Sequence, residues 1–478
     1  MRLTAMLTVL CALLTVAPAQ WEPDVRLTND PANSFLCGQQ CIAAVGDTLH
    51  VIFNDDRTGR YEVYYTRSLD AGVTWDSAVR VSPGDSNRIF SATVAASGAE
   101  VHISWEGRNY GSLQYRRSTD GGVTWLPETA LVVSPSCGTP FLSADGDRVG
   151  LVWGDGRDGN WNGELYYKQS GNGGSSWTAD TRLTVDTDSV LDKEACLAVC
   201  GNRRYIAWTR GDWNTGDNRA WLIRSTNDGV SWEPRRPVTA DTTKQNQAMV
   251  AAVGSHVHTC WWDGRPGGYG IWYRGSTDNG ATWSAEQYLA DTLYGSDYPV
   301  IAAAGGNVYV AYRAWPGGQF VIDYRGSTDN GQTWSAETTL TTAAGMGTAV
   351  LAAAGTRAHL ILYDNRDGNF EIYYKRNLTA GGLEEMVNSE LRRVKGKAVI
   401  VRGLLFLPES DFTLHYSLFT LSGQKVLDLR PGPNDVSHVP PGVYFVMEQT
   451  AVSSQHAGRT AVGGERSAVA VRRVVIAR

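Results

Sequence analysis

The eight residues STDNGATW, Ser276 to Trp283, return 51 residues later as STDNGQTW, Ser327 to Trp334. Earlier copies with the same pattern, Ser-x-Asp/Asn-x-Gly-x-Thr/Ser-Trp, begin at Ser68, Ser118, Ser170 and Ser225. The closing tryptophans stand at positions 75, 125, 177, 232, 283 and 334, so the period is close to 50 residues. A repeat of this length, rich in strand-forming residues, predicts the blades of a β-propeller.

Each period holds the same four short stretches. In the fifth they read QAMVAAVG (247–254), HVHTCWWDGR (256–265), YGIWYRGS (269–276) and, after the turn, WSAEQYLAD (283–291). β-Branched and aromatic residues dominate the stretches, and Gly, Asn and Asp fill the turn. The pattern predicts a four-stranded sheet in each blade, with the eight-residue turn joining the third strand to the fourth.

The number of blades follows from the two ends of the repeat region. A seventh set of three strands lies at 347–377, but no tryptophan follows it. The missing strand resembles WEPDVRLT, Trp21 to Thr28, which matches WEPRRPVT, Trp232 to Thr239. We therefore predict an all-β, seven-bladed propeller in which the N-terminal strand completes the last blade. Such closure leaves no open sheet edge.

The remaining segments suggest export. Arg2, the apolar run Leu3 to Val16 and Ala17-Pro18-Ala19 indicate a signal peptide at 1–19. We expect the propeller at 20–383, a linker at 384–396 and a small C-terminal β-sandwich at 397–478. No later apolar run reaches about 20 residues, so we predict no transmembrane segment in the mature chain. With 43 basic and 49 acidic residues, the composition gives no reason to expect a nucleic-acid partner.

Six cysteines follow the signal segment: Cys37, Cys41, Cys137, Cys196, Cys200 and Cys260. An oxidising compartment permits disulfides. Two residues four apart on an extended strand lie about 13 Å apart, so Cys37–Cys41 and Cys196–Cys200 can pair only where the chain bends. The connectivity stays open. No histidine stands at ligand spacing beside these cysteines, and we predict neither a metal site nor a cofactor.

The eight-residue turns resemble the Asp-box repeats of bacterial neuraminidases, and residues 21–383 resemble the propellers of the sialidase superfamily. This resemblance implies an arginine triad for the substrate carboxylate, a Tyr–Glu nucleophile pair and an aspartate acid/base. The sequence departs from it in having seven blades rather than six. It also lacks the Arg-Ile-Pro motif, because the nearest string is NRIF at 87–90.

The C-terminal tail resembles the sorting domain of type IX secretion substrates. The strings that carry this resemblance are LFTLSGQKVLDL (418–429), PPGVYFV (440–446) and RRVVIAR (472–478). The resemblance implies type IX secretion machinery as a partner, and a secreted or outer-surface location reached through the periplasm. An ordinary small β-sandwich is the alternative.

The acidic residue of the turn is interpreted as structural. Its positions are Asp70, Asp120, Asn172, Asn227, Asp278 and Asp329. Asparagine keeps a carbonyl acceptor but cannot serve as a carboxylate base or nucleophile. The role that survives this exchange is hydrogen bonding to the amides of a turn.

Ligand-binding candidates lie on the face opposite the turns, where loops join the second strand of each blade to the third and one blade to the next. The second-to-third loops carry Asp/Arg pairs that could bind anionic sugars or could brace their own blades. The loops that enter the innermost strands differ between blades and offer further polar groups. The binding candidates are Arg57, Arg88, Arg108, Arg157, Gln245, Gln247, Asp263, Arg265 and Arg366.

Three readings of the function remain open at this point. The first is an exo-acting glycoside hydrolase of sialidase type, for which Asp192, Glu194, Asp297 and Tyr298 are the catalytic candidates. The second is a surface propeller that binds extracellular glycans or mediates adhesion without hydrolysis. A structural or protein-binding propeller is a third reading.

Overall fold

The computed structural model divides the chain into two compact units, with the division between Asn377 and Leu378. Of residues 20–378, the last of which belongs to the second unit, it describes all except 84–88, 90, 108–110, 159–162, 187–189, 213, 241–243, 266–268, 291–294 and 342–346. In the rest of the second unit it describes residues 399–476, except for 402–403, 408–413, 421–424, 431, 437–438, 440–441 and 451–469. The predicted signal peptide and linker lie outside the described residues.

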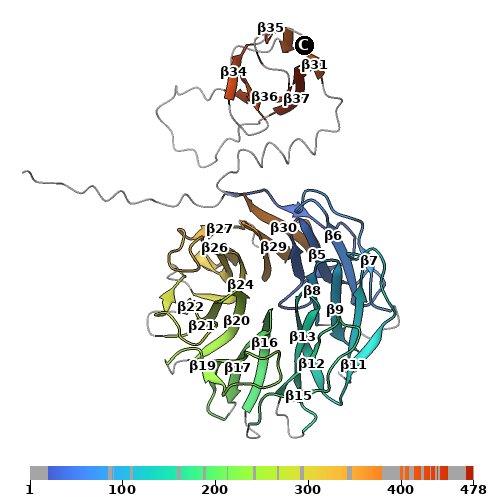
Figure 1. The fold of residues 1–478 in the computed structure, drawn as a ribbon, viewed down its shortest axis with the longest axis vertical. Helices are drawn as coiled ribbons and strands as arrows, with labels where there is room; N and C mark the ends of the chain where they lie inside the picture. Colours follow the sequence, from blue (N-terminus) through green and yellow to red (C-terminus); the bar gives the residue numbers. More distant parts are fainter. Residues whose placement is uncertain are drawn as a thin grey trace, which may run out of the picture. The chain divides into compact units, whose positions relative to one another are not determined.

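The first unit is a ring of seven antiparallel sheets, coloured blue to orange in Figure 1. Blades one to three consist of β3 (Ser34–Phe35), β4 (Ile42–Val45), β5 (Thr48–Asp55), β6 (Glu62–Ser68) and β7 (Val79–Arg80); β8 (Ala92–Ser97), β9 (Glu100–Glu106), β10 (Ser112–Ser118) and β11 (Thr129–Val133); and β12 (Cys137–Asp145), β13 (Arg148–Asp155), β14 (Glu164–Ser170) and β15 (Thr181–Arg182).

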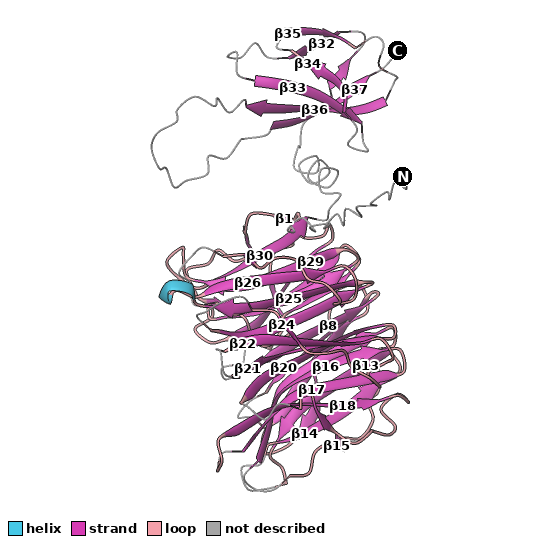
Figure 2. Ribbon diagram, turned by 90° about the vertical axis from the view of Figure 1, so that its left-hand side faces the viewer, coloured by secondary structure: helices cyan, strands magenta, loops and turns pink. Residues whose placement is uncertain are grey.

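Blades four to six consist of β16 (Val190–Cys200), β17 (Arg203–Asp212), β18 (Asp217–Ser225) and β19 (Arg236–Pro237); β20 (Gln245–Val253), β21 (His256–Asp263), β22 (Gly270–Ser276) and β23 (Gln287–Tyr288); and β24 (Ser296–Ala304), β25 (Asn307–Ala314), β26 (Val321–Ser327) and β27 (Thr338–Thr339). A single 3-10 turn, η2 (Pro316–Gly318), is the one helical element of the described residues (Figure 2). No described helix has the length and apolar character needed to cross a membrane.

The seventh blade confirms the predicted closure. It consists of β28 (Ala349–Ala354), β29 (Arg357–Asp364) and β30 (Glu371–Leu378), completed from the other end of the unit by β1 (Gln20–Trp21) and β2 (Val25–Arg26). Val25 pairs with Tyr374 and Arg26 with Tyr373. Ion pairs from Glu22 to Arg376 at 2.8 Å and from Arg26 to Glu371 at 2.5 Å reinforce the closure. The all-β, seven-bladed architecture predicted from the sequence is therefore confirmed.

The core lies between neighbouring blades and is built mainly from the first three strands of each blade. Along each second strand, successive side chains point to opposite faces of the sheet. Because adjacent blades cover both faces, these strands are almost wholly buried. Trp105, Trp153, Trp208 and Trp261 stand at equivalent positions of β9, β13, β17 and β21, and each is at most 1% exposed. This packing holds the ring rigid around its axis.

The eight-residue turns fasten each blade to the preceding one. In the sixth, Ser327 Oγ donates to Asp329 Oδ1 at 2.7 Å, and Asp329 Oδ1 accepts from the amide of Thr333 at 2.9 Å. Trp334 then packs edge-on against Tyr273 of blade five, with ring centroids 4.8 Å apart. Gly331 has φ +79°, and a Cβ there would lie 1.9 Å from the Tyr273 hydroxyl, so only glycine fits.

The asparagine copies of the turn make the same bonds. Asn172 Oδ1 accepts from the amide of Ser176 at 2.9 Å, and its Nδ2 donates to the Ser176 hydroxyl at 2.9 Å. In the aspartate copies the threonine hydroxyl donates to the carboxylate instead, as Thr282 does to Asp278 at 2.6 Å. The acidic residue of the turn therefore serves as a hydrogen-bond acceptor within its own loop.

The second unit contains two small sheets. The larger has the strand order β31 (Val399–Val401), β37 (Ala470–Ile476), β36 (Gly442–Thr450), β33 (Leu414–Thr420) and β34 (Lys425–Leu429). The smaller pairs β32 (Leu404–Leu407) with β35 (Gly432–Asp435). Two of the strings that resemble a sorting domain thus lie largely on β33, β34 and β36.

Candidate functional site

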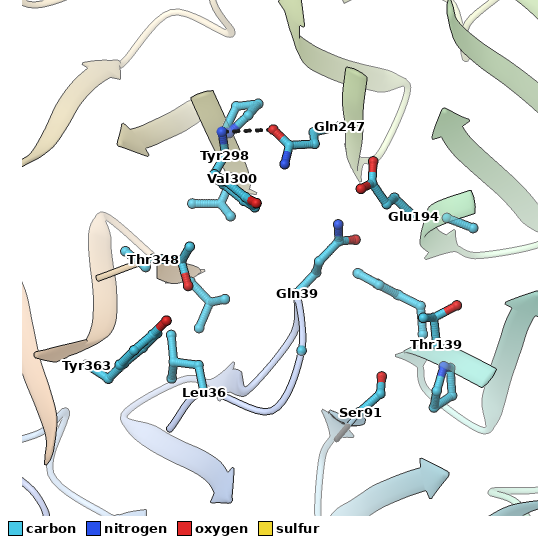
Figure 3. A pocket seen from close by; sticks show the side chains of 17 residues that line it. Leu36, Gln39, Ser91, Thr139, Glu194, Gln247, Tyr298, Val300, Thr348 and Tyr363 are labelled. Atoms are coloured by element: carbon cyan, nitrogen blue, oxygen red, sulfur yellow. Dashed lines mark hydrogen bonds between the residues drawn. The ribbon is translucent and has the colours of Figure 1, made fainter. Parts of the chain in front are cut away.

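One side chain from each of the seven blades lines a pocket on the axis of the ring. The seven residues stand at corresponding positions, at or just before the innermost strand of each blade, as the pairing registers of the blades show. In blade order they are Gln39, Ser91, Thr139, Glu194, Gln247, Tyr298 and Thr348, called here the axial ring. Figure 3 shows all seven around one opening. They lie at the ends of the blades opposite the eight-residue turns.

Four consecutive members of the axial ring stand at β-bulges. The strand register shifts at this point in β12, β16, β20 and β24. The residues there have left-handed backbones, with φ of 50° at Thr139, 57° at Glu194, 55° at Gln247 and 49° at Tyr298. A left-handed residue with a Cβ costs roughly 1–2 kcal/mol, and bulges commonly redirect a side chain beside a site.

Neighbouring blades hold these backbones in place. The amide of Thr139 donates to Glu106 Oε1 at 2.6 Å, and the amide of Gln247 donates to the Thr209 hydroxyl at 2.7 Å. The amide of Tyr298 donates to Oε1 of Gln247 at 2.9 Å, the bond drawn in Figure 3. Each of these acceptors belongs to the preceding blade, so the ring geometry is fixed by contacts between blades.

The pocket has a volume of about 280 Å³ and walls that are mostly apolar. The walls between the members of the axial ring are supplied by Leu36, Gly38, Pro140, Phe141, Ala195, Pro299, Val300, Ala349, Val350 and Tyr363. Tyr298 is 44% exposed, and the guanidinium of Arg313 stacks on its ring at 4.4 Å from the centroid. A concave apolar site with a few convergent polar groups is the usual form of a small-ligand pocket.

The polar groups of the pocket are nearly all uncharged. Glu194 is the only charged side chain among the described lining residues, and its Oε2 accepts from the Thr209 hydroxyl at 3.1 Å. The side chains of Gln39, Ser91 and Thr348 have no hydrogen-bond partner within the described part of the chain, so they remain available to a ligand. Behind the lining, burial raises the pKa of Glu106, which holds Thr139.

The structure separates the residues that the sequence grouped as catalytic or axial candidates. Glu194, Gln247 and Tyr298 line the pocket. Asp192 is 2% exposed and accepts from the indole of Trp208 at 2.6 Å, whereas Asp297 forms a fork with Arg313 at 2.7 and 2.8 Å. Oε1 of the buried Gln245 accepts from the amide of Ala220 at 3.1 Å. These three lie outside the pocket lining.

The arginines of the second-to-third loops bind within their own blades. Arg57, Arg157, Arg265 and Arg366 are each bonded to the aspartate two positions earlier, Asp55, Asp155, Asp263 and Asp364 respectively. Each guanidinium also lies over an aromatic ring of the adjacent strand, at 4.0–4.5 Å from its centroid. None of the four lines the pocket. Arg88 and Arg108 lie outside the described residues.

Blade four inverts this charge pattern. Arg210 takes the position that Asp155 has in blade three, and Asp186 accepts from both Arg210 at 2.9 Å and Arg235 at 2.6 Å. Carboxylate oxygens of Glu164, Asp186 and Asp192 lie within 4.8 Å of one another, a spacing that could hold a cation. The two guanidinium groups already supply positive charge at Asp186, so the cluster is accounted for without a metal ion.

Reasoning from the sequence missed four of the seven residues in the axial ring: Gln39, Ser91, Thr139 and Thr348. The signal was present, because aligning the innermost strands places them at the position of Glu194 and Tyr298. The bulges themselves carry no such signal, since all four left-handed residues are of types that seldom adopt this backbone.

Comparisons with known proteins assign no family to the chain. No protein-family model and no curated protein matches the chain. The structure is similar to the Hadza microbial sialidase Hz136 (16% identity, 68% of this chain and 73% of that one, TM-score 0.43). It is also similar to the phage phi92 endosialidase (11%, 74% and 68%, TM-score 0.45) and to the polysaccharide lyase Uly1 (11%, 71% and 89%, TM-score 0.47). At TM-scores below 0.5 such a likeness identifies neither a reaction nor a substrate.

Proposed function

We propose that this chain binds extracellular glycans through its axial pocket, which receives one uncharged sugar residue. The observation that carries this proposal is the axial ring, in which every blade contributes one hydrogen-bonding side chain to an apolar-walled cavity of about 280 Å³. Amide and hydroxyl groups both donate and accept, which suits sugar hydroxyls. The apolar walls and the exposed face of Tyr298 suit the C–H faces of a pyranose ring.

The charges at the site favour a neutral sugar over sialic acid. A carboxylate is best held by the forked donors of arginine. The four described arginines of the second-to-third loops are bound to their own aspartates, and the described pocket lining contains no basic side chain. Glu194 would repel an anionic ligand at the centre of the site.

Glycoside hydrolysis is the second candidate, favoured by the presence of Tyr298 and Glu194 in one pocket. A few glycosidases use a tyrosine nucleophile in place of a carboxylate. In this alternative Tyr298 attacks the anomeric carbon while Glu194 accepts the phenol proton. The glycosidic C–O bond breaks, and the departing oxygen takes a proton from solvent. Water then displaces Tyr298 from the sugar, and the phenol regains its proton. The described lining holds one carboxylate, whereas most glycosidases use two.

The proposed setting is the cell surface or the surrounding medium, reached through the periplasm. It is supported by the apolar segment at 3–16, the small-residue cleavage pattern at 17–19 and the C-terminal strings that resemble a type IX sorting domain. Cell fractionation with an antibody against the propeller tests it, and retention in the cytoplasm would contradict it.

A glycan array tests the binding proposal. Fluorescently labelled chain 20–478 should bind glycans with a neutral terminal or internal residue, with affinity then measured by calorimetry. Thr348→Val keeps the shape and removes one ring hydroxyl, so it should weaken binding several-fold. Tyr298→Gly suits the left-handed backbone and should weaken it at least tenfold. Tyr288→Ala, at a tyrosine that is 46% exposed outside the pocket, is the control and should bind normally.

Hydrolysis is measured in parallel on a panel of aryl glycosides that includes a sialoside. The binding proposal expects no turnover, whereas the hydrolase alternative expects turnover that Tyr298→Phe and Glu194→Gln abolish. Binding confined to sialylated glycans, or an array without any signal, would overturn the proposal of a neutral sugar.

A further inference from the structure

The segment from Cys37 to Cys41 bends at the edge of the axial pocket. The bend brings the two sulfur atoms to 3.5 Å from each other, and the Cys41 thiol also donates to the carbonyl of Gly38 at 3.3 Å. Both side chains are almost completely buried, at 1% and 0% exposure. Gln39, a member of the axial ring, stands inside the bend.

The bend is held by strands on both sides of it. The amide of Ala92 donates to the carbonyl of Cys37 at 2.7 Å, and the amide of Val94 donates to that of Gln40 at 3.0 Å. On the other side, the amide of Ile52 donates to the carbonyl of Cys41 at 2.9 Å. The approach of the sulfurs therefore follows from the backbone, which is fixed by blade two and by β5.

A second cysteine pair with the same spacing shows the contrast. Cys196 and Cys200 lie beyond the bulge of β16, on a regular part of the strand. Their thiols point to different carbonyls, those of Val250 and Gly254, each at 3.5 Å. Four residues of regular strand span about 13 Å, too far for a bond. Identical spacing thus gives a close pair in blade one only.

We propose that Cys37 and Cys41 form a disulfide in the exported protein, which closes the loop that presents Gln39 to the axial pocket. The bond requires an S–S distance of ~2.05 Å, so the sulfurs must approach by about 1.5 Å, a change that side-chain torsions can supply. This proposal rests on the proposed export, which supplies an oxidising compartment, and not on glycan binding, because it concerns the covalent state of the loop rather than its ligand.

The oxidant is a disulfide, either that of a dithiol oxidase or oxidised glutathione. One cysteine loses its proton to solvent, and its thiolate attacks the oxidant, which forms a mixed disulfide and expels one thiolate. The other cysteine, also deprotonated, then attacks the mixed disulfide and expels the second thiolate. The chain gives up two electrons and two protons, and the oxidant becomes two thiols.

The order of events follows from burial. In the folded chain, burial raises the pKa of Cys37 well above its usual range, which suppresses the attacking thiolate. The exchange therefore belongs to folding, before blade two covers the bend. Once the ring has closed, the same burial shields the bond from reductants.

Peptide mapping tests the bond directly. Chain 20–478, exported to a bacterial periplasm, is alkylated with N-ethylmaleimide in guanidinium and digested with trypsin. One tryptic peptide, 27–57, contains both Cys37 and Cys41, and another, 194–203, contains both Cys196 and Cys200. Without prior reduction, peptide 27–57 should take up no maleimide, and after reduction it should take up two. Peptide 194–203 should take up two in both samples and serves as the matched control.

Uptake of one or two maleimides by unreduced peptide 27–57 would overturn the proposal. Cys41→Ser supplies a second reading that does not depend on the wild-type bond. In this variant Cys37 should be a free thiol, so peptide 27–57 should take up one maleimide without reduction. No uptake would show that Cys37 pairs with a different cysteine, and would equally refute the assignment.

Discussion

Trp21, at the start of the propeller, packs edge-on against Tyr324 of blade six, with ring centroids 4.8 Å apart and planes at 82°. The same contact joins Trp334 to Tyr273 and Trp75 to Tyr374, where the tryptophan closes an eight-residue turn. The sequence has no such motif after the third strand of the seventh blade, and this strand instead receives β1 and β2 from the N-terminal side. Trp21 thus fills the place of the missing turn tryptophan and closes the ring.

Removal of this closing contact should destabilise the whole propeller. Trp21→Ala deletes a large, partly buried ring and is expected to lower the free energy of unfolding by about 2–3 kcal/mol, less than for a fully buried tryptophan. Trp21→Phe keeps an edge-on ring, so its free energy of unfolding should fall clearly less than that of Trp21→Ala. Urea denaturation followed by tryptophan fluorescence measures both. A Trp21→Ala chain as stable as the wild type would show that the N-terminal strand does not close the ring.

The turn acceptor should tolerate asparagine better than alanine. Asp329 accepts from the amides of Gln332 and Thr333 at 3.0 and 2.9 Å and from the Ser327 hydroxyl at 2.7 Å. Asp329→Asn keeps a carbonyl oxygen in the same place, as Asn172 does in its own turn, whereas Asp329→Ala leaves these donors without an acceptor. Thermal midpoints should fall in the order wild type, Asn, Ala. Equal losses for Asn and Ala would point to a role for the charge itself.

The left-handed backbone at the axial ring predicts an unusual preference for glycine. Gln247→Gly and Gln247→Ala both lose the bond to the amide of Tyr298, so they differ mainly in the backbone at φ 55°. Glycine should be more stable than alanine by about 1 kcal/mol, judged from chemical denaturation. Ala248→Gly, one residue further along the extended strand, is the control and should destabilise. If Gln247→Ala were more stable than Gln247→Gly, residue 247 would not have the left-handed backbone of the bulge.

Buried histidines should make the propeller sensitive to acid. Nδ1 of His258 lies 2.7 Å from the Tyr273 hydroxyl, and His50, His102 and His359 make the same contact with Tyr65, Tyr115 and Tyr374. Burial lowers the pKa of His258, His50 and His102 from 6.5 to about 4, and that of His359 to about 3. A lowered pKa gives stability that is present above pH 6.5 and is lost as the pH falls through 4.

Urea denaturation between pH 7 and 4 measures this effect. His258→Gln keeps a polar side chain beside Tyr273 and cannot titrate, so the stability of this variant should fall less steeply as the pH is lowered. The slope of its unfolding free energy against pH should correspond to about one fewer proton bound on unfolding. The comparison uses the slope rather than the absolute stability, because the substitution also changes packing. An unchanged slope would show that His258 is accessible to protons in the folded chain.

Asp192 should have the opposite pH dependence. Burial raises its pKa to about 7, although the Trp208 indole bonds to it. A raised pKa means that the folded chain holds a proton that the unfolded chain releases near pH 4, so this stability is present at low pH and is lost as the pH rises through 7. Asp192→Asn keeps an acceptor for Trp208 and should remove this loss. If the two chains lose stability in parallel between pH 4 and 7, Asp192 is ionised when folded.

The amino-acid sequence alone determined the architecture, because the physics of the repeat is local. A blade is specified by the residues of the eight-residue turn, by the tryptophan that closes it and by the strand-forming stretches around it. The number of blades follows from the number of repeats. The match between Trp21 and Trp232 even predicted how the ring closes. The sequence repeats also placed Glu194, Gln247 and Tyr298 at the start of the innermost strands, where the pocket lies.

Only the tertiary structure decided which of the polar residues act together. Asp192 and Glu194 are two apart, and on a regular strand they would share a face, but the bulge at Glu194 turns one into the pocket and leaves the other buried against Trp208. Cys37 and Cys196 are each followed by another cysteine four residues later. Backbone hydrogen bonds from blade two hold a bend that brings the sulfurs together only in the first pair. Both outcomes depend on hydrogen bonds between residues far apart in the chain, and no local pattern encodes them.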